Sequence, residues 1–274
     1  MPKNNSVFER IAHRGGSREA PENTLPAIEL AVQKYHVDRV EVDIRLTKDN
    51  VPVIFHDVAL ERITNARGLV RTYTLEELKK VDAGFWFDPD EKGKFPFRKK
   101  GVMIPTLEEL LNQFPDTSFC LEIKEKKPET VPPIAEVIGR AKGSGALIVG
   151  SFHIEIIRAL RQASASFAES FLAKEEVSRA QLAFHMGQKK FSTEGARFAS
   201  LPTKEGKTRL DEPAWIEFLH QNGLKVFYWT INEKEEAEEL IRRGADGIMS
   251  DYPERLNEIR SQKSEDRNQT KDKS

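Results

Sequence analysis

The chain has 274 residues, with 43 Lys and Arg side chains against 44 Asp and Glu side chains, and a formal net charge of −1. This balance excludes the basic surface that nucleic-acid binding requires. No apolar run approaches the roughly 20 residues of a membrane span, and the first ten residues lack the apolar stretch of a secretory signal. We therefore expect a cytoplasmic protein with no nucleic-acid partner and no membrane span.

Short β-like runs alternate with helix-sized segments along the chain. About eight strand-helix units in roughly 250 residues are typical of an α/β fold of the TIM (β/α)8 barrel type, and a doubly wound open sheet is the alternative. Capping sequences predict helix starts at Thr74, Thr106, Asn232 and Asp251. In chain order, the predicted strands are Phe8–His13, Arg39–Asp43, Val53–His56, Phe119–Ile123, Leu147–Gly150, Ala165–Ala168, Arg197–Leu201, Lys225–Thr230 and Asp246–Ser250.

Two segments depart from this alternation. Residues 57–101 contain several Gly and Pro residues and an aromatic cluster, which predicts a small inserted subdomain after the second strand of the barrel. Residues 261–274 contain no apolar side chain, so we expect a disordered tail. The predicted organisation is a single barrel domain over 1–260 that carries this insertion.

The segment from Val40 to Ile44 alternates apolar and acidic residues. Side chains alternate along a strand, so Glu41 and Asp43 share one face and the apolar residues share the other. In a solvated antiparallel sheet this pattern would be an ordinary outer face. On the inner face of a parallel barrel, however, two carboxylates repel each other and are costly to bury unless a cation neutralises them. The barrel interpretation therefore favours a metal site.

The same alternation recurs in a later strand, where Cys120, Glu122 and Lys124 share one face. Glu122 adds a third carboxylate, and an all-oxygen donor set favours Mg2+, Ca2+ or Mn2+ over Zn2+. A surface ion pair between Glu122 and Lys124 is the alternative. Cys120 is expected to be a small buried residue, since no neighbouring cation or His would lower its thiol pKa.

Two His residues end predicted strands, His13 in His-Arg-Gly-Gly and His56 in Phe-His-Asp. Active sites of barrels lie at the carboxyl ends of the strands, so the two His side chains are candidates for a general base and a general acid. Arg14 could bind an anionic oxygen through its guanidinium, and the two glycines that follow it could expose backbone amides to the same ligand. Taken alone, a Gly15-Gly16 pair is more often a turn, and a single His is more often a structural or surface residue.

Together, these segments resemble the glycerophosphodiester phosphodiesterase family, in order and in spacing, over nearly the whole chain. The match is weak only between Ser151 and Arg209. The similar segments are IAHRGGSREAPENTLPAIEL (11 to 30), EVDIRLTKDNVPVIFHD (41 to 57), TLEELKKVDAGFWF (74 to 87), IPTLEEL (104 to 110), LEIK (121 to 124), YWTINE (228 to 233) and DGIMSDYPERL (246 to 256).

The resemblance implies a TIM barrel with an insertion after the second His, and one divalent cation, Mg2+ or Ca2+ with Mn2+ as a further candidate. It also implies roles for individual side chains. Glu22 and Asn23, in the opening motif, are expected mainly to fix the loop and cap a helix, with a direct active-site role as the alternative. The implied site consists of His13 and His56 as acid/base pair, Glu41, Asp43 and Glu122 as metal ligands, Arg14 and Lys124 at the phosphate, and Trp229 in the substrate wall.

The expected activity is metal-dependent hydrolysis of a small glycerophosphodiester to sn-glycerol 3-phosphate and an alcohol, with His13 as base and His56 as acid. The nucleophile is either water or the glycerol 2-hydroxyl of the substrate. One alternative is lysophospholipase D-like cleavage, which an apolar groove at the barrel mouth would favour. The other alternative is a non-catalytic phosphodiester-binding barrel, which would bind substrate without turnover.

Overall fold

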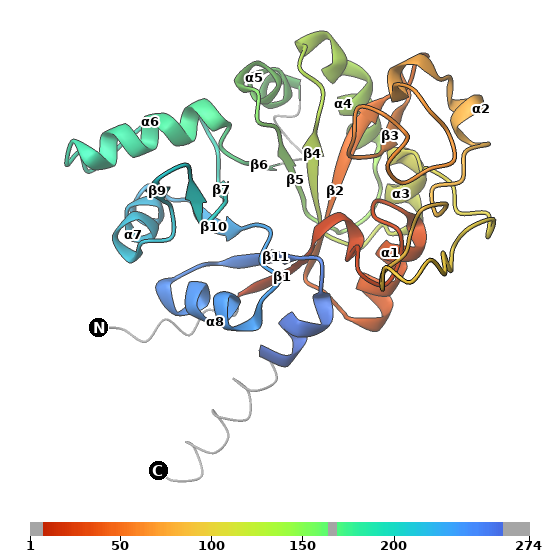
Figure 1. The fold of residues 1–274 in the computed structure, drawn as a ribbon. Helices are drawn as coiled ribbons and strands as arrows, with labels where there is room; N and C mark the ends of the chain where they lie inside the picture. The colour runs from red at the N-terminus through yellow and green to blue at the C-terminus, as the bar shows by residue number, and fades with distance from the viewer. Residues whose placement is uncertain (1–7, 164–168, 260–274) are drawn as a thin grey trace.

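In the computed structural model, which describes residues 8–163 and 169–259, eight parallel strands form a nearly closed barrel surrounded by helices (Figure 1). A parallel bridge between Phe171 and Phe198 joins the two end strands of the sheet, so the TIM barrel prediction is confirmed. In barrel order, the strands are β6 (Glu169–Ser170), β5 (Leu147–Gly150), β4 (Phe119–Ile123), β2 (Arg39–Leu46), β1 (Glu9–Ala12), β11 (Gly247–Ser250), β10 (Lys225–Tyr228) and β7 (Phe198–Leu201).

Helices follow the strands around the outside of the barrel. Three short turns of 3-10 helix lie in loops, at His13–Gly15, Val70–Thr72 and Pro128–Thr130. The longer helices are α1 (Leu25–Glu29, continued by a π-helical turn at Leu30–Lys34), α2 (Leu75–Leu78), α3 (Leu107–Gln113), α4 (Val131–Arg140), α5 (Ile154–Ala163), α6 (Lys174–His185), α7 (Pro213–Gln221), α8 (Lys234–Arg243) and residues 253–259.

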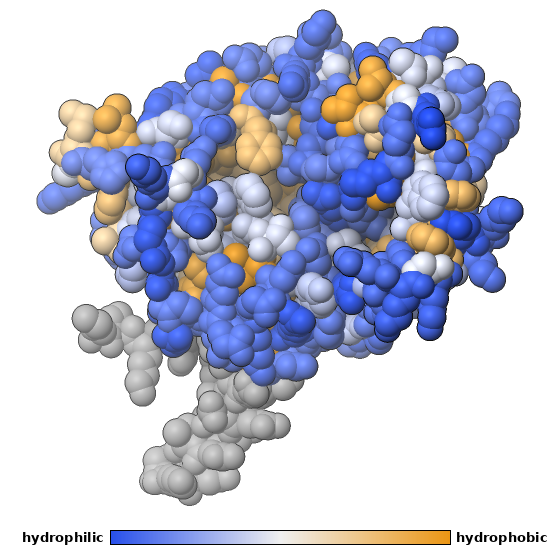
Figure 2. Space-filling view, viewed as in Figure 1, coloured by the Kyte–Doolittle hydropathy of each residue, from blue (hydrophilic) through white to orange (hydrophobic). Residues whose placement is uncertain are grey.

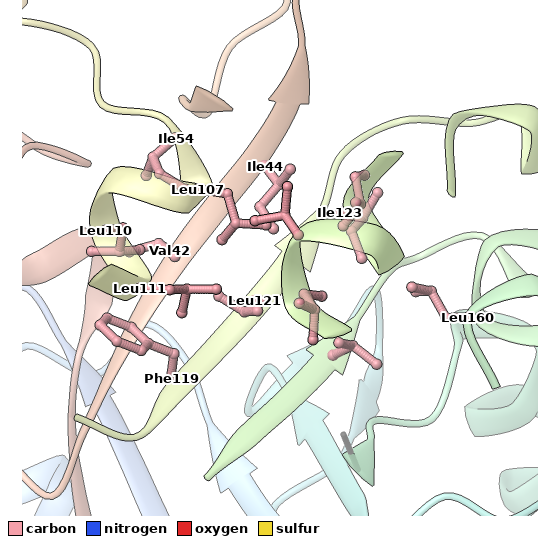
Figure 3. Packing of buried hydrophobic residues seen from close by; sticks show 14 of the residues in the cluster. Val42, Ile44, Ile54, Leu107, Leu110, Leu111, Phe119, Leu121, Ile123 and Leu160 are labelled. Carbon is pink, nitrogen blue, oxygen red and sulfur yellow. The ribbon is translucent and has the colours of Figure 1, made fainter. Parts of the chain in front are cut away.

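Strand alternation divides the core into an outer and an inner part. Apolar side chains on the outer face of β2 and β4 pack against α3, as Figure 3 shows for Val42, Ile44, Leu121, Ile123, Leu107, Leu110 and Leu111. Inside the barrel, a second cluster fills the space with Ile11, Cys120, Ile148, Phe171, Phe198, Phe227 and Met249. Cys120 is a buried free cysteine, as expected, and burial raises the pKa of its thiol.

The predicted helix starts divide into two pairs. Thr74 and Thr106 each form a complete capping box, and each helix begins at the next residue. Asn232 and Asp251 do not cap helices: α8 has Glu233 as its N-cap, and Asn232 Nδ2 donates to Asp251 Oδ2 over 2.9 Å. Helices nevertheless begin at Lys234 and at residue 253, two residues after each predicted start, so only the predicted capping residues are wrong. Both side chains form a tertiary hydrogen bond at the barrel mouth instead.

The third predicted strand, Val53–His56, is the shorter β3 (Pro52–Ile54), and it pairs antiparallel with β2 outside the barrel order. Residues 57–101 then form a segment beside β2 and α1, drawn in orange and yellow in Figure 1. Its apolar side chains form a cluster with those of β3 and the chain before α3, including Val53, Phe55, Leu60, Val70, Leu78, Val102 and Ile104.

Two predictions fall wholly outside the described residues. These are the strand at Ala165–Ala168 and the disordered tail at 261–274. A two-stranded ribbon, β8 (Lys204–Glu205) with β9 (Thr208–Arg209), follows β7 at the barrel mouth. Within 8–163 and 169–259, every helix is too short or too polar to cross a membrane.

Candidate active site

Three carboxylates converge inside the barrel from two neighbouring strands. Glu41 and Asp43 lie on the inner face of β2, and Glu122 lies on β4 in register with Asp43. One oxygen from each of the three lies within 4.8 Å of the others. Glu41 and Asp43 are only 5% and 1% exposed, so this is an interior cluster and not the solvated outer face that the sequence left open.

The charges of this cluster are only partly compensated by the protein. Burial and the neighbouring Asp43 raise the pKa of Glu41 to about 8. Burial alone would also raise the pKa of Asp43, but Lys124 and Arg14 outweigh it and lower that pKa. Burial also raises the pKa of Glu122 in spite of the Lys124 ammonium. A buried cluster of three carboxyl groups, whose negative charges the neighbouring Lys and Arg compensate only in part, fits a hard divalent cation.

Each candidate His is held at Nδ1 by a carboxylate. His13 Nδ1 lies 2.7 Å from Asp251 Oδ1, and His56 Nδ1 lies 2.7 Å from Asp57 Oδ1. Burial alone would lower the pKa of His13, yet Asp251 and Glu41 together raise it. The bond from His13 contributes to lowering the pKa of Asp251 to about 2, so this partner is an anion that orients the ring. In both His residues, Nε2 is then the nitrogen left for proton exchange.

Arg14 lies in a strained turn directly after β1. Its φ of 51° is left-handed, its backbone N–H donates to Glu41 Oε2 over 2.9 Å, and its guanidinium Nη1 donates to Glu22 Oε1 over 2.9 Å. Gly15 and Gly16 continue the turn at positive φ, and the Gly16 amide donates to the His13 carbonyl. The Gly16 amide is therefore used within the turn, and the suggestion that it is exposed to a ligand is wrong.

Lys124 and Trp229 both lie near Phe152, and the Lys124 ammonium is 5.7 Å from the centroid of the Phe152 ring. Lys124 Nζ is 2.5 Å from Glu122 Oε1 and 3.0 Å from Asp43 Oδ1, so it bridges two of the carboxylates. The surface ion pair that the sequence left open is thus an interior one, since the Lys124 side chain is 14% exposed. Trp229 follows the seventh barrel strand, β10, and packs edge-to-face on Phe152 with ring centroids 6.0 Å apart.

One cavity of about 620 Å3 at the barrel mouth is lined by His13, Arg14, Glu41, His56, Glu122, Lys124 and Trp229. Asp43, the third carboxylate, is 1% exposed and is not among the lining residues. Figure 2 shows hydrophilic surface (blue) adjoining hydrophobic surface (orange) at the middle of this face. On one side, the polar part of the lining comes from β2, β4 and the chain that follows β1, β3 and β4. Lys174, Ser200, Lys204 and Glu205 add polar groups on the other side. The apolar part comes from the strands and loops on the other side of the barrel, and includes Phe152, Phe171, Leu172, Val177, Leu201 and Trp229.

Sequence reasoning gave no role to the partners of the two His residues. Asp57 directly follows His56 in the sequence, and this position alone could have identified it as the partner of His56. Asp251 directly follows β11 and was assigned to a helix start, although its position at a strand end is typical of a barrel site residue. Asn23, expected to cap a helix, instead donates from Nδ2 to Asp43 Oδ2 over 2.8 Å.

Comparison with known proteins identifies the family. Residues 13–255 match the model of the Glycerophosphoryl diester phosphodiesterase family. A glycerophosphodiester phosphodiesterase of Caldanaerobacter subterraneus is 32% identical over 90% of this chain and 95% of its own length. A mouse lysophospholipase D is 29% identical over 89% of this chain and 79% of its own.

Among solved structures, a phosphodiesterase of Oleispira antarctica in complex with the product sn-glycerol-3-phosphate has a TM-score of 0.73. It is 28% identical to this chain, and the alignment covers 92% of this chain and 95% of that one. A Mycobacterium tuberculosis phosphodiesterase domain with a TM-score of 0.80 is 22% identical and shows the same fold. The chain therefore belongs to the glycerophosphoryl diester phosphodiesterase family.

Proposed function

We propose that this enzyme hydrolyses glycerophosphodiesters to sn-glycerol 3-phosphate and an alcohol. The main support is that one cavity is lined by two carboxylate-held His residues and by Glu41 and Glu122, two members of the cluster of three convergent carboxylates. Glu41, Asp43 and Glu122 would hold a divalent cation, Mg2+ or Ca2+ or Mn2+. Such an ion supplies Lewis-acid neutralisation of charge on the phosphoryl oxygens.

The remaining roles fall to side chains of the chain itself. The Arg14 guanidinium and the Lys124 ammonium would donate to the phosphate oxygens, and Trp229 would form a wall against the glycerol carbons. His13 would accept the proton of the nucleophile at Nε2, since its Nδ1 is held by Asp251. His56 would donate a proton from Nε2 to the alcohol oxygen as the phosphorus–oxygen bond breaks.

Release of glycerol 3-phosphate from glycerophosphocholine, measured after chelation and after return of each metal, tests this proposal. We expect chelation to abolish activity, and His13→Ala or His56→Ala to lower kcat by about 100-fold or more. His185→Ala, on the outer helix α6, is the matched control. Wild-type rates in either active-site variant, or substrate binding without turnover, would contradict the proposal.

The nucleophile requires a separate experiment. With water as nucleophile, its oxygen bonds to phosphorus and its proton leaves through His13. With the glycerol 2-hydroxyl, the same transfer gives a cyclic phosphate that water then opens. A diester that lacks the 2-hydroxyl remains a substrate only in the first case, so its rate of cleavage distinguishes the two routes.

A second candidate activity, lysophospholipase D-like cleavage, is favoured by the apolar part of the cavity. Leu172, Val177 and Leu201 form apolar surface in the cavity. A small polar alcohol such as choline or ethanolamine would leave this surface largely without contacts. Lysophospholipids assayed beside glycerophosphocholine would show a higher kcat/KM if the acyl chain contacts this surface. Equal or lower values would leave the water-soluble diesters as the preferred substrates.

A further inference from the structure

Arg62 lies in the insertion and carries none of the roles assigned above. Its guanidinium uses all three nitrogen atoms: Nε donates to Asp57 Oδ2 over 2.5 Å, and the two Nη atoms donate to the two oxygens of Glu22 over 2.8 and 2.6 Å. A planar fork that binds one carboxylate bidentately and a second one through Nε fixes the relative positions of both.

Each of these carboxylates holds one side chain of the candidate active site. The other oxygen of Asp57, Oδ1, lies 2.7 Å from His56 Nδ1. Glu22 Oε1, besides its bond from Arg62, accepts a bond from Arg14 Nη1 over 2.9 Å. A continuous chain of charge-assisted hydrogen bonds therefore runs from the His56 imidazole through Arg62 to the Arg14 guanidinium.

The two ends of this chain come from different loops. Arg14 and Glu22 follow β1, whereas His56 and Asp57 follow β3 and lead into the insertion. Binding to Arg62 lowers the pKa of Glu22 and of Asp57 against the opposing effect of burial, so both act as anions. Arg62 is thus the side chain that joins the two loops across the edge of the site.

We propose that Arg62 is a positioning residue that sets the His56 imidazole and the Arg14 guanidinium relative to each other through Asp57 and Glu22. This role rests on the proposed hydrolase function. The Arg62 side chain is 47% exposed, and ion pairs at such exposure contribute little to folding stability. Its loss is therefore expected to change catalysis more than it changes the unfolding transition.

Kinetics of Arg62→Gln and Arg62→Lys test the proposal, with Arg71→Gln as control. Arg71 is exposed in the same insertion, and the described residues include no ion-pair partner for it. We expect Arg62→Gln to lower kcat about 10- to 100-fold, and Arg62→Lys to recover only part of it, because an ammonium cannot reproduce the fork. Glu22→Gln, which leaves the bond from Arg62 to Asp57 in place, should mainly raise KM.

Two further measurements separate positioning from a general loss of structure. Added guanidinium should restore part of kcat in Arg62→Ala, since the site of the missing group is open to solvent. Nitrogen-15 NMR should show neutral His56 protonated at Nδ1 in the wild type and as a tautomer mixture in Arg62→Gln. Arg62→Gln kinetics within twofold of Arg71→Gln, or an unchanged tautomer, would overturn the proposal. If the wild type cleaves no diester, the hydrolase function fails, and the tautomer measurement still decides the role of Arg62.

Discussion

Binding of a divalent cation to Glu41, Asp43 and Glu122 is expected to release a proton from Glu41. Burial and the Asp43 charge raise the pKa of Glu41 to about 8. A carboxyl with this pKa is about 90% protonated at pH 7 and about 10% protonated at pH 9, whereas a metal ligand must be ionised. We therefore expect about 0.9 proton released per ion at pH 7 and about 0.1 at pH 9, with roughly fivefold tighter binding at pH 8 than at pH 7.

Calorimetric titration with Mg2+ or Ca2+, in two buffers of different ionisation enthalpy, measures this release directly. The Glu41→Gln variant has no proton to lose at this position, so its heat of binding should depend much less on the buffer than that of the wild type. A second source is His13, whose Nε2 lies 3.9 Å from Glu41 Oε2, and His13→Gln separates the two. Release below about 0.2 proton at pH 7, or equal release in Glu41→Gln, would refute the assignment of the charge to Glu41.

Three further predictions concern catalysis, packing and pH. Asp251→Asn, which frees the His13 tautomer, should lower kcat by about 100-fold or more with an unchanged circular dichroism spectrum. Gly143→Ala, whose Cβ would overlap a backbone carbonyl at a φ of +149°, should lower the unfolding free energy in urea by about 2–4 kcal/mol. The hydrogen bond to Asp246 raises the pKa of His220, so its stabilising effect is full below about pH 6.5 and lost as pH rises through the higher folded-state pKa. The difference in melting temperature between wild type and His220→Gln should accordingly shrink on the alkaline side.

Much of the fold follows from local pattern. Leu147–Gly150 and Phe119–Ile123 are strands at the bounds expected from their apolar runs, because these segments are buried on both faces of a parallel sheet. The inward direction of Glu41 and Asp43 follows from the two-residue period once the barrel is assumed. These inferences need only residues that are close in sequence.

Other parts of the site depend on contacts between distant residues. Asp251 reaches His13 across 238 positions because the last strand pairs with the first, a contact that follows from closure of the barrel and not from the residues around either side chain. The antiparallel direction of β3 depends on how far β2 extends past the barrel, and β2 runs to Leu46 where the sequence predicted an end at Asp43. The bridging position of Arg62 requires both loops to be in place.

The hairpin formed by β2 and β3 has a consequence for how this enzyme could be altered. The Phe55 amide donates to the Asp43 carbonyl over 2.9 Å, so the chain leading to His56 is tied to the strand that carries Glu41 and Asp43. The insertion, residues 57–101, begins two residues after this hydrogen bond in the chain. Chimeras that exchange the insertion beyond Arg62 for the equivalent segment of a relative should therefore keep the catalytic geometry, since none of the residues exchanged lines the cavity.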